Sequence, residues 1–364
     1  MSDSSDNKVL NGVQRILVVR YRFIGDTILT VPFLRNLRSA YPNAVIDVLV
    51  GPQSGAVLEN CPYVNELIEF DTTRFHKYDR GKGKAKSFLS YLLMLRKRRY
   101  DAVFLLKRSL SSAILALFSG ARYRIGYATE GRNLLLTHPV RWRKDIHEVE
   151  SLFDILDSAG IKVTNKELES WSTDDEIAKT RAIVPETAHD GLKILVHAPA
   201  AHPDKMYPLE KWKVVLSELN SKLHGANPLF FFSGAERDAS LNETLIAKSG
   251  VAGVNPAGKL SLRESMALYR QMDLAVCVDS GPAHLCAAAG IPTIAIFGPT
   301  DPERWRPYGA KHTAVFDRSI QCGACADKKT LTNHACLTEL EPGKIIDAVM
   351  CAYSDFVDPA GLSL

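Results

Sequence analysis

The sequence predicts an α/β protein made of two doubly wound domains, each with a parallel sheet at its centre. Short aliphatic and β-branched runs, which suit strands buried on both faces, alternate with longer segments of helical periodicity. The alternation occurs in two series, and a polar, charged stretch between residues 161 and 190 separates them. The chain of 364 residues is also long enough to build two hydrophobic cores.

The first series opens with the run RILVV at residues 15–19, which predicts a buried strand. Apolar side chains then recur at helical spacing over residues 26–40, which predicts a helix. The later elements of this series are expected at residues 44–50 (strand), 53–60 (helix), 67–70 (strand), 85–99 (helix), 101–106 (strand) and 110–119 (helix). Such an order of strands and helices predicts right-handed βαβ units on one sheet.

The second series has the same character. Its elements are expected at residues 193–196 (strand), 209–222 (helix), 229–232 (strand), 236–248 (helix), 251–254 (strand), 262–272 (helix), 274–278 (strand), 282–289 (helix) and 293–297 (strand). A last helix near residues 343–353 could cross back to the first domain. The predicted organisation is a disordered tail (1–14), an N-terminal Rossmann-like domain (15–175), a C-terminal Rossmann-like domain (190–342) and a C-terminal helix and tail (343–364). Two such domains with a cleft between them outline the GT-B architecture of glycosyltransferases.

Charge and cysteine content limit the class of partner and the compartment. The chain has 45 Lys and Arg and 41 Asp and Glu, which gives a net charge of only +4. This charge does not indicate a nucleic-acid partner. Basic residues crowd between Arg74 and Arg124, either as a solvated helix face or as a surface for an anionic partner. Cys277 and Cys286 lie in apolar runs where reduced, buried thiols are expected, so we expect a reducing compartment. We expect neither a signal peptide nor a spanning segment, so any membrane contact should be peripheral.

The turn after the first strand carries the first candidate site residues. It offers a single glycine, Gly25, in place of the G-x-G-x-x-G signature, which argues against a nicotinamide or flavin dehydrogenase. Asp26 follows at the carboxyl edge of the predicted sheet, where ligands usually bind. Its carboxylate suits either a helix N-cap or a catalytic role, and the local sequence is compatible with both.

The segment VDSGPAHL at residues 278–285 joins a predicted buried strand to a helix of small residues. Asp279 or Ser280 can cap this helix, and Gly281 lets a ligand approach the backbone. The exposed N–H groups and the positive end of the helix dipole would favour a pyrophosphate group. His284, one turn into the helix, suits either a phosphate contact or ordinary packing.

Two further charged residues follow strands of the second series. Lys205 could neutralise a departing diphosphate, or could be a solvated loop lysine. Glu236 could accept hydrogen bonds from a ribose diol, or could simply favour the start of its helix.

Four segments in the right order resemble glycosyltransferase family 9, the bacterial lipopolysaccharide heptosyltransferases. They are RILVVRYRFIGDTILTVPFLRNLRSAYPNAVIDVLV, HAPAAHPDKMYPLEKWKVVLSEL, VDSGPAHLCAAAGIPTIAIFGPTDPERWRPYG and CLTELEPGKIIDAV. The resemblance implies transfer of a heptose from ADP-heptose to the lipopolysaccharide inner core, with inversion, no required metal and no cofactor. It also implies that Asp26 is the general base and that Lys205 assists catalysis at the donor phosphates. The implied donor site comprises Gly25, Lys205, Glu236 (at the ribose), Asp279, Ser280, Gly281 and His284.

The resemblance also changes the interpretation of the basic region. Lipopolysaccharide precursors carry phosphates and acidic sugars on an anionic membrane surface, so a cytoplasmic enzyme peripheral to the inner face of the inner membrane is expected. The predicted acceptor contacts are Arg22, Lys107, Arg108, Arg122 and Arg124. The tetrad Arg20-Tyr21-Arg22-Phe23, which replaces a smaller polar turn of the best-known members, leaves the acceptor and exact donor open.

The cluster Cys322, Cys325, His334 and Cys336 has spacing that can hold structural zinc. One C-x-x-C with a nearby third cysteine is a weaker signal than two paired knuckles, so reduced thiols or a local disulfide are the preferred interpretation.

Two alternative functions fit the same motifs. The chain could be a GT-B transferase that uses another nucleotide sugar for O-antigen, capsule or a glycoprotein. It could also be a catalytically inactive nucleotide-sugar-binding protein, although the presence of Asp26 together with the donor-site residues favours an enzyme.

Overall fold

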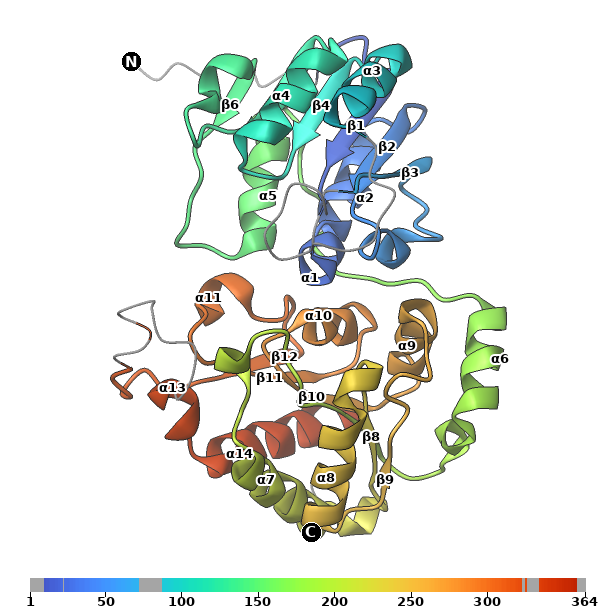
Figure 1. Ribbon diagram of the computed structural model, residues 1–364, viewed down its shortest axis with the longest axis vertical. Helices are drawn as coiled ribbons and strands as arrows, with labels where there is room; N and C mark the ends of the chain where they lie inside the picture. The colour runs from blue at the N-terminus through green and yellow to red at the C-terminus, as the bar shows by residue number, and fades with distance from the viewer. Residues whose placement is uncertain (1–9, 22, 72–86, 323–324, 326–333, 359–364) are drawn as a thin grey trace. The chain divides into compact units, whose positions relative to one another are not determined.

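The computed structural model describes residues 10–21, 23–71, 87–322, 325 and 334–358. The chain divides into two compact units, Met1–Glu167 and Leu168–Leu364. Each unit contains one parallel sheet of six strands (Figure 1), which confirms the predicted α/β class with two doubly wound domains. The predicted domain limits of 15–175 and 190–342 remain predictions.

The first unit has the strand order β3-β2-β1-β4-β5-β6. Its strands are β1 (Arg15–Val19), β2 (Val45–Val50), β3 (Glu66–Glu69), β4 (Ala102–Leu105), β5 (Tyr123–Tyr127) and β6 (His138–Val140). Its helices are α1 (Ile24–Ile28), α2 (Val31–Ala40), α3 (Phe88–Arg98), α4 (Leu110–Ser119) and α5 (Glu148–Asp157), with 3-10 turns η1 (Gly55–Leu58) and η2 (Arg132–Leu135). The sequence did not predict β5, β6 or α5.

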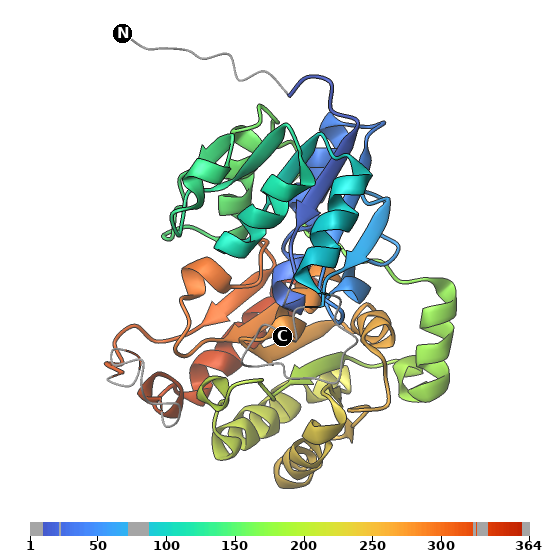
Figure 2. The same ribbon diagram turned by 45° about the horizontal axis from the view of Figure 1, so that its top comes forward.

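Alternate residues of β1 face opposite layers of helices. Leu17 and Val19 belong to the core shared with α3 and α4, and both are fully buried. On the other face, Phe33 of α2 packs edge-on against Phe104 of β4, with ring centroids 5.6 Å apart. Helices therefore cover both faces of the sheet, as Figure 2 also shows.

The predicted helix at residues 26–40 is two helices, α1 and α2, which meet at Leu29 and Thr30. Pro32 lies in the first turn of α2. Proline lacks an N–H group and is tolerated only at the start of a helix, so this position begins a new helix.

The second unit has the strand order β12-β11-β10-β7-β8-β9. Its strands are β7 (Lys193–His197), β8 (Leu229–Phe232), β9 (Gly253–Val254), β10 (Leu274–Val278), β11 (Thr293–Ile296) and β12 (His312–Val315). Its α-helices are α6 (Asp174–Ile183), α7 (Leu209–Lys222), α8 (Ala239–Ser249), α9 (Leu262–Tyr269), α10 (Gly281–Ala288), α11 (Pro302–Trp305), α13 (Ala335–Thr338) and α14 (Pro342–Ala352). Short turns complete it: η3 (Pro185–Ala188), η4 (Pro203–Lys205), η5 (His224–Ala226), η6 (Glu236–Asp238) and η7 (Tyr353–Val357).

Two features at the ends of the second unit differ from the sequence prediction. The polar stretch assigned to a linker contains α6, which begins with a capping box between Thr173 and Glu176 and packs beside α9. The last helix, α14, lies in the core of the second unit, where Ile345 and Val349 are fully buried against the sheet and α7 (Figure 1). Within the described residues, no helix combines the length and apolar character needed to cross a bilayer.

Candidate active site

Asp26 lies in α1, which follows β1 at the carboxyl edge of the first sheet. The interpretation of Asp26 as a helix N-cap was wrong, because the N-cap of α1 is Phe23 and Asp26 is in the first helical turn. Its side chain is 28% exposed, so the carboxylate is accessible to a bound molecule. The role as general base remains a prediction.

Arg20 connects Asp26 to the core of the first unit. Its Nη2 lies 3.5 Å from Oδ1 of Asp26 and 2.9 Å from Oε1 of Glu148, and both Arg20 and Glu148 are buried. Its Nη1 donates to the carbonyl oxygen of Leu106 at 2.7 Å. Burial alone would lower the pKa of Arg20, but the two carboxylates raise it above its ordinary value. A cation held this firmly fixes the position of the Asp26 carboxylate.

Two of the predicted acceptor residues share this edge of the sheet. Lys107 follows β4, donates from Nζ to the carbonyl of Tyr21 at 3.1 Å and lies 4.2 Å from the centre of the Tyr21 ring. The Arg108 guanidinium stacks over Trp142 at 3.9 Å. Lys107 therefore lies beside the loop that leads from β1 to Asp26, and Arg108 is the next residue along the chain.

The other predicted acceptor residues do not join this group. Arg124 pairs with Val103 near the start of β4, so Arg124 and Arg122 lie at the amino edge of the sheet, opposite Asp26. The Arg124 guanidinium donates to the carbonyls of Leu135 and Ala121, both at 2.8 Å. Strand direction thus separates these two arginines from Asp26, and we withdraw them from the predicted site. The remaining candidate, Arg22, falls outside the described residues.

In the second unit, loops after three neighbouring strands converge at the carboxyl edge of the sheet. Nζ of Lys205, after β7, lies 2.7 Å from Oδ2 of Asp279, after β10. The hydroxyl of Thr300, after β11, donates to the same carboxylate oxygen. Asp279 is buried and the Lys205 side chain is 26% exposed, so the lysine presents its charge to the solvent side. This edge, between β10 and β7, is the switch point at which ligands bind in doubly wound sheets.

The start of α10 lies next to this ion pair. Ser280 is the N-cap residue, but neither it nor Asp279 caps the helix with a side-chain hydrogen bond, as the sequence suggested they could. The Ser280 hydroxyl donates instead to the carbonyl of Val278 at 3.0 Å. The N–H of Gly281, the first residue of α10, receives no side-chain cap, whereas Pro282 has no N–H and the N–H of Ala283 donates to the carbonyl of Ser280 at 3.2 Å. The Gly281 N–H and the positive end of the helix dipole can therefore bind an anionic ligand. The side chain of His284 is buried in the same helix.

Glu236 follows β8 and begins η6. In the strand order, β7 lies between β10 and β8, so the loop with Lys205 lies between the loops with Asp279 and Glu236. The side chain is exposed. Gly258 holds the backbone beneath it, with a φ of +77° and with its N–H donating to the carbonyl of Gly234 at 3.1 Å. A Cβ atom at Gly258 would lie 2.6 Å from Cα of Glu236, so only glycine allows this approach.

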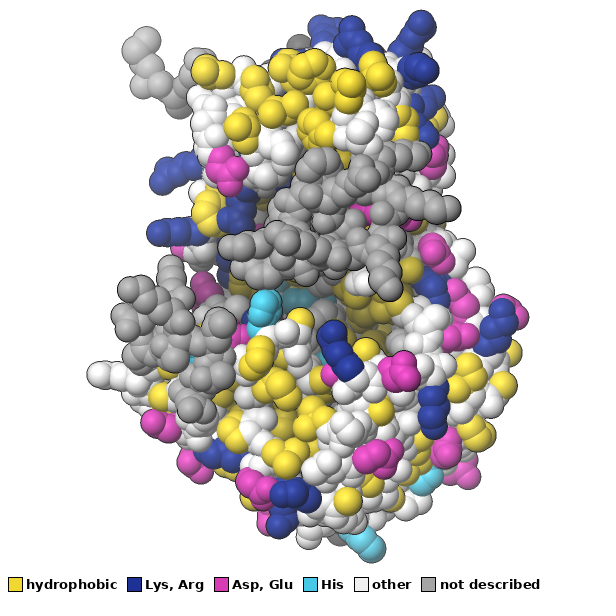
Figure 3. All heavy atoms as spheres, in the orientation of Figure 1, with side chains coloured by type: hydrophobic (Ala, Val, Ile, Leu, Met, Phe, Trp, Pro, Cys, Tyr) yellow, Lys and Arg dark blue, Asp and Glu magenta, His cyan; other side chains and the backbone are white. Residues whose placement is uncertain are grey.

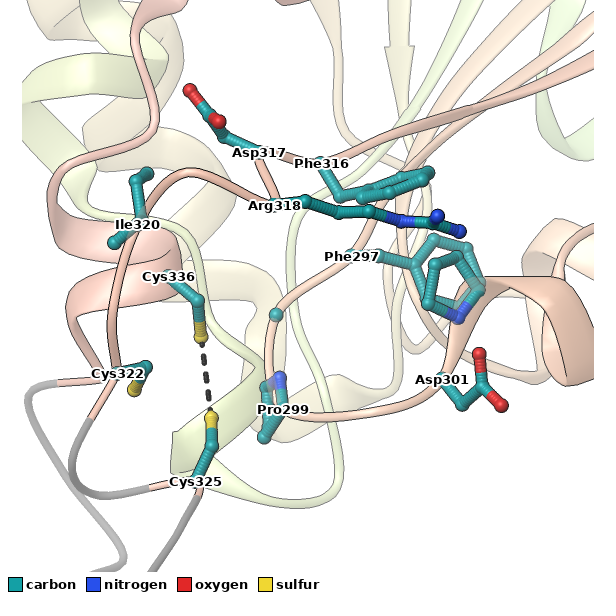
Figure 4. A pocket seen from close by; sticks show the side chains of 12 residues that line it. Phe297, Pro299, Asp301, Phe316, Asp317, Arg318, Ile320, Cys322, Cys325 and Cys336 are labelled. Carbon is teal, nitrogen blue, oxygen red and sulfur yellow. Dashed lines mark hydrogen bonds between the residues drawn. The ribbon is translucent and has the colours of Figure 1, made fainter.

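A pocket of about 410 Å³ borders this edge (Figure 4). Pro299 and Asp301, which flank Thr300, line one side, and Phe316 and Ile320 line another. Cys322, Cys325 and Cys336 of the predicted cluster also line the pocket, and none of them is in a disulfide. The structure thus brings Lys205, Asp279, Ser280, Gly281 and Glu236 to one edge, with a pocket beside them.

Sequence reasoning missed Arg20, Glu148, Thr300 and Gly258. Arg20 stood within the tetrad that departs from the best-known members, so its position was visible but its partner was not. Glu148 lies 128 residues away from Arg20, and no local pattern connects them.

Known proteins provide the last observations on the site. A model of the family described as glycosyltransferase family 9 (heptosyltransferase) matches residues 90–335. Lipopolysaccharide heptosyltransferase 3 of Escherichia coli is 27% identical over 301 residues, which cover 79% of this chain and 84% of that protein. Lipopolysaccharide heptosyltransferase 2 of Salmonella typhimurium is 26% identical over 315 residues, 83% of this chain and 87% of the other.

Solved structures show the same fold. The glycosyl transferase family 9 structure from Veillonella parvula matches with a TM-score of 0.82 at 21% identity, covering 95% of this chain and 99% of that one. The E. coli ADP-heptose lipopolysaccharide heptosyltransferase II matches with a TM-score of 0.73 at 21% identity, covering 93% and 98%. The predicted GT-B fold class is confirmed.

Proposed function

Because this chain belongs to glycosyltransferase family 9, as its motifs predict, we propose that it transfers a heptose from ADP-heptose to a lipopolysaccharide core acceptor. Its curated relatives are lipopolysaccharide heptosyltransferases. One observation carries the proposal for this chain: Lys205, Asp279 and the uncapped start of α10 meet at the carboxyl edge of the second sheet. That combination of a cation, the Gly281 N–H and the positive end of a helix dipole suits a diphosphate.

The experiment that tests the donor is calorimetry of the purified protein against ADP-, UDP- and GDP-sugars, with mass analysis of the product formed on a core acceptor. Binding of ADP-heptose with formation of a heptosylated product supports the proposal. Preference for a donor with uridine or guanosine in place of adenosine would indicate a transferase that uses another nucleotide sugar. Binding without any product would indicate a binding protein that has lost catalysis.

In the mechanism that we propose, Asp26 is the general base. Its partly exposed carboxylate takes the proton from the acceptor hydroxyl as the oxygen attacks the anomeric carbon from the face opposite the diphosphate. One displacement gives inversion. Arg20 is a positioning residue, because it holds the Asp26 carboxylate while its own charge is also paired with Glu148.

The second unit supplies donor binding and leaving-group stabilisation. Lys205 turns from Asp279 toward the diphosphate as negative charge develops on the phosphate oxygens, and the N–H of Gly281 at the start of α10 donates to one of them. Glu236 accepts hydrogen bonds from the ribose hydroxyls. Because a lysine and a helix terminus provide this positive charge, the transfer needs no metal ion at the diphosphate. Addition of Mg²⁺ or Mn²⁺ is expected to leave the rate unchanged.

We further propose that the enzyme acts in the cytoplasm at the inner face of the inner membrane, and that the α3/α4 face of the first unit contacts the lipid. The α3/α4 face comprises Leu89, Leu93, Arg96 and Lys97 of α3 and Leu117 and Phe118 of α4, all exposed. In Figure 3, hydrophobic side chains gather over these two helices with Lys and Arg at their edge. Apolar side chains bordered by cations suit an anionic membrane surface. Lys107 and Arg108 would contact acidic groups of the acceptor.

A further inference from the structure

Four side chains with metal-binding chemistry converge in the second unit, at a place that the proposed transfer does not use. Cys322 and Cys325 lie in the segment after β12, and His334 and Cys336 lie at the start of α13. One sulfur or nitrogen atom from each residue lies within 4.8 Å of those of the other three. His334 is buried, and its Nδ1 is the atom that faces the sulfurs.

The distances between these atoms match the edges of one coordination tetrahedron. With Zn–S bonds of about 2.3 Å and Zn–N bonds of about 2.0–2.1 Å, a tetrahedral site has S···S edges of about 3.8 Å and S···N edges of about 3.5 Å. In the structure, Sγ of Cys325 lies 3.6 Å from Sγ of Cys336. Nδ1 of His334 lies 3.4 Å from Sγ of Cys325 and 3.8 Å from Sγ of Cys322.

A disulfide accounts for this arrangement less well than a metal ion. A disulfide joins only two sulfurs, at about 2.05 Å, and it would leave the third cysteine and the imidazole beside it without a role. Figure 4 shows the sulfurs of Cys325 and Cys336 pointing toward each other, with Cys322 on the same wall of the pocket. Three thiolates and one imidazole are instead a complete ligand set for zinc.

We propose that Cys322, Cys325, His334 and Cys336 bind one zinc ion in a closed, structural site. Four protein ligands leave no open position for substrate or water, so the ion would not take part in catalysis. This proposal departs from the sequence interpretation of reduced thiols or a local disulfide.

The site has a structural task that follows from its position. It joins the segment after β12 to α13, whose Leu337 is buried in the core. Leu337 packs so closely on Gly298 that a Cβ atom there would lie 2.6 Å from its Cγ. Gly298 begins the loop that carries Thr300 to the Asp279 carboxylate. The ion would therefore hold one wall of the pocket beside the candidate donor site.

The test is elemental analysis of the full-length protein, purified without chelators or an affinity metal, together with thiol counting. Wild-type protein and the control Cys351→Ser, which changes an exposed cysteine of α14 outside the cluster, are expected to hold about one zinc per chain. Cys322→Ser and His334→Ala are expected to lose most of it.

A second measurement covers the case in which these variants fail to fold. Removal of the metal from wild-type protein is expected to lower the unfolding temperature by about 5–10 °C, and zinc should restore it. Wild-type protein without metal, whether its cysteines are free thiols or a disulfide, would overturn the proposal, and stoichiometric iron would overturn the choice of zinc. None of these outcomes depends on the identity of the donor, so the site can fail while the proposed function stands.

Discussion

At the scale of single residues, the carboxylates of Asp26 and Asp279 each lie against one cation. Asp26 is partly exposed and is held by a buried arginine, Arg20, that also pairs with Glu148. Asp279 is buried and pairs with the more exposed Lys205. The more exposed member of each pair is therefore the Asp26 carboxylate in the first unit and the Lys205 ammonium group in the second. This difference supports a proton acceptor in one unit and a phosphate contact in the other.

Substitution of Asp26 by Asn should remove the base and keep the shape of the side chain. We expect kcat to fall by about 10²–10⁴-fold, because a positioned general base contributes that much, while the affinity for ADP stays the same. Steady-state transfer kinetics and calorimetry measure the two quantities. The exposed Asp190→Asn is the control. Wild-type turnover in the Asp26 variant would remove this residue from the mechanism.

Substitution of Lys205 by Met should weaken donor binding. The variant loses the charged contact to the diphosphate, and the Asp279 carboxylate, which no longer pairs with a cation, repels the negatively charged diphosphate. A loss of about 10–100-fold in ADP affinity follows from the usual strength of a hydrogen bond to a charged group. Calorimetry with ADP measures it, and Lys213→Met, at an exposed position of α7, is the control. Unchanged affinity would mean that Lys205 does not contact the donor.

At the scale of elements, short turns at the ends of strands position the donor residues. Glu236 opens η6, and Gly258 lies directly beneath it in the left-handed region of the backbone. Ser280 is the N-cap residue of α10 but makes no side-chain cap, and its hydroxyl donates to the carbonyl of Val278. In both places, a backbone feature rather than a side chain prepares the site.

Substitution of Gly258 by Ala tests the first of these backbone features. The new methyl group would collide with Glu236, so we expect both a loss of stability of about 1–3 kcal/mol and weaker ADP binding. Gly250→Ala is a matched control, because Gly250 also has a positive φ, of +67°, but nothing lies within 4 Å of its Cβ position. Urea unfolding and calorimetry measure the two effects. If both variants bind ADP equally well, Glu236 does not hold the ribose.

At the scale of the whole molecule, each unit has its own sheet and core, and the proposed reaction needs residues from both. The first unit also carries the α3/α4 face. Arg98, at the end of α3, is not part of that face, because it pairs with Glu66 at 2.6 Å. The exposed cations Arg96 and Lys97 lie beside exposed Leu93 on the same helix.

The double variant Leu93→Ser/Phe118→Ser tests the α3/α4 face. These side chains are 58% and 54% exposed, and their burial in lipid should strengthen vesicle binding about tenfold or more. Cosedimentation with anionic phosphatidylglycerol vesicles should show that loss, whereas Val214→Ser on α7 should bind as wild type does. Turnover of a short, soluble acceptor should not change, and raised salt should weaken vesicle binding. Equal binding of the double variant and the wild type would reject this face.

Most strands and helices of this protein follow from local sequence patterns. The β1 run RILVV and the helical spacing of α4 and α7 are visible within windows of a few residues, because burial repeats with the period of the element. The strands β5, β6 and β12 were not predicted, and β5 begins with two partly exposed residues. The strands β6 and β12 lie at sheet edges and also have exposed residues, so they lack the continuous apolar run of a central strand.

The motifs around Asp26 and Asp279 were likewise visible in the sequence, as was the family that they indicate. The partners of these residues were not, since Lys205 and Asp279 are 74 residues apart and Arg20 and Glu148 are 128 apart. The order of the parallel strands brings such distant loops to one edge of a sheet. The same order places Arg124 at the opposite edge, although it is close to Arg108 in the sequence. The local sequence determines which side chains follow each strand, whereas the order of strands in the assembled sheet determines which of these side chains come into contact.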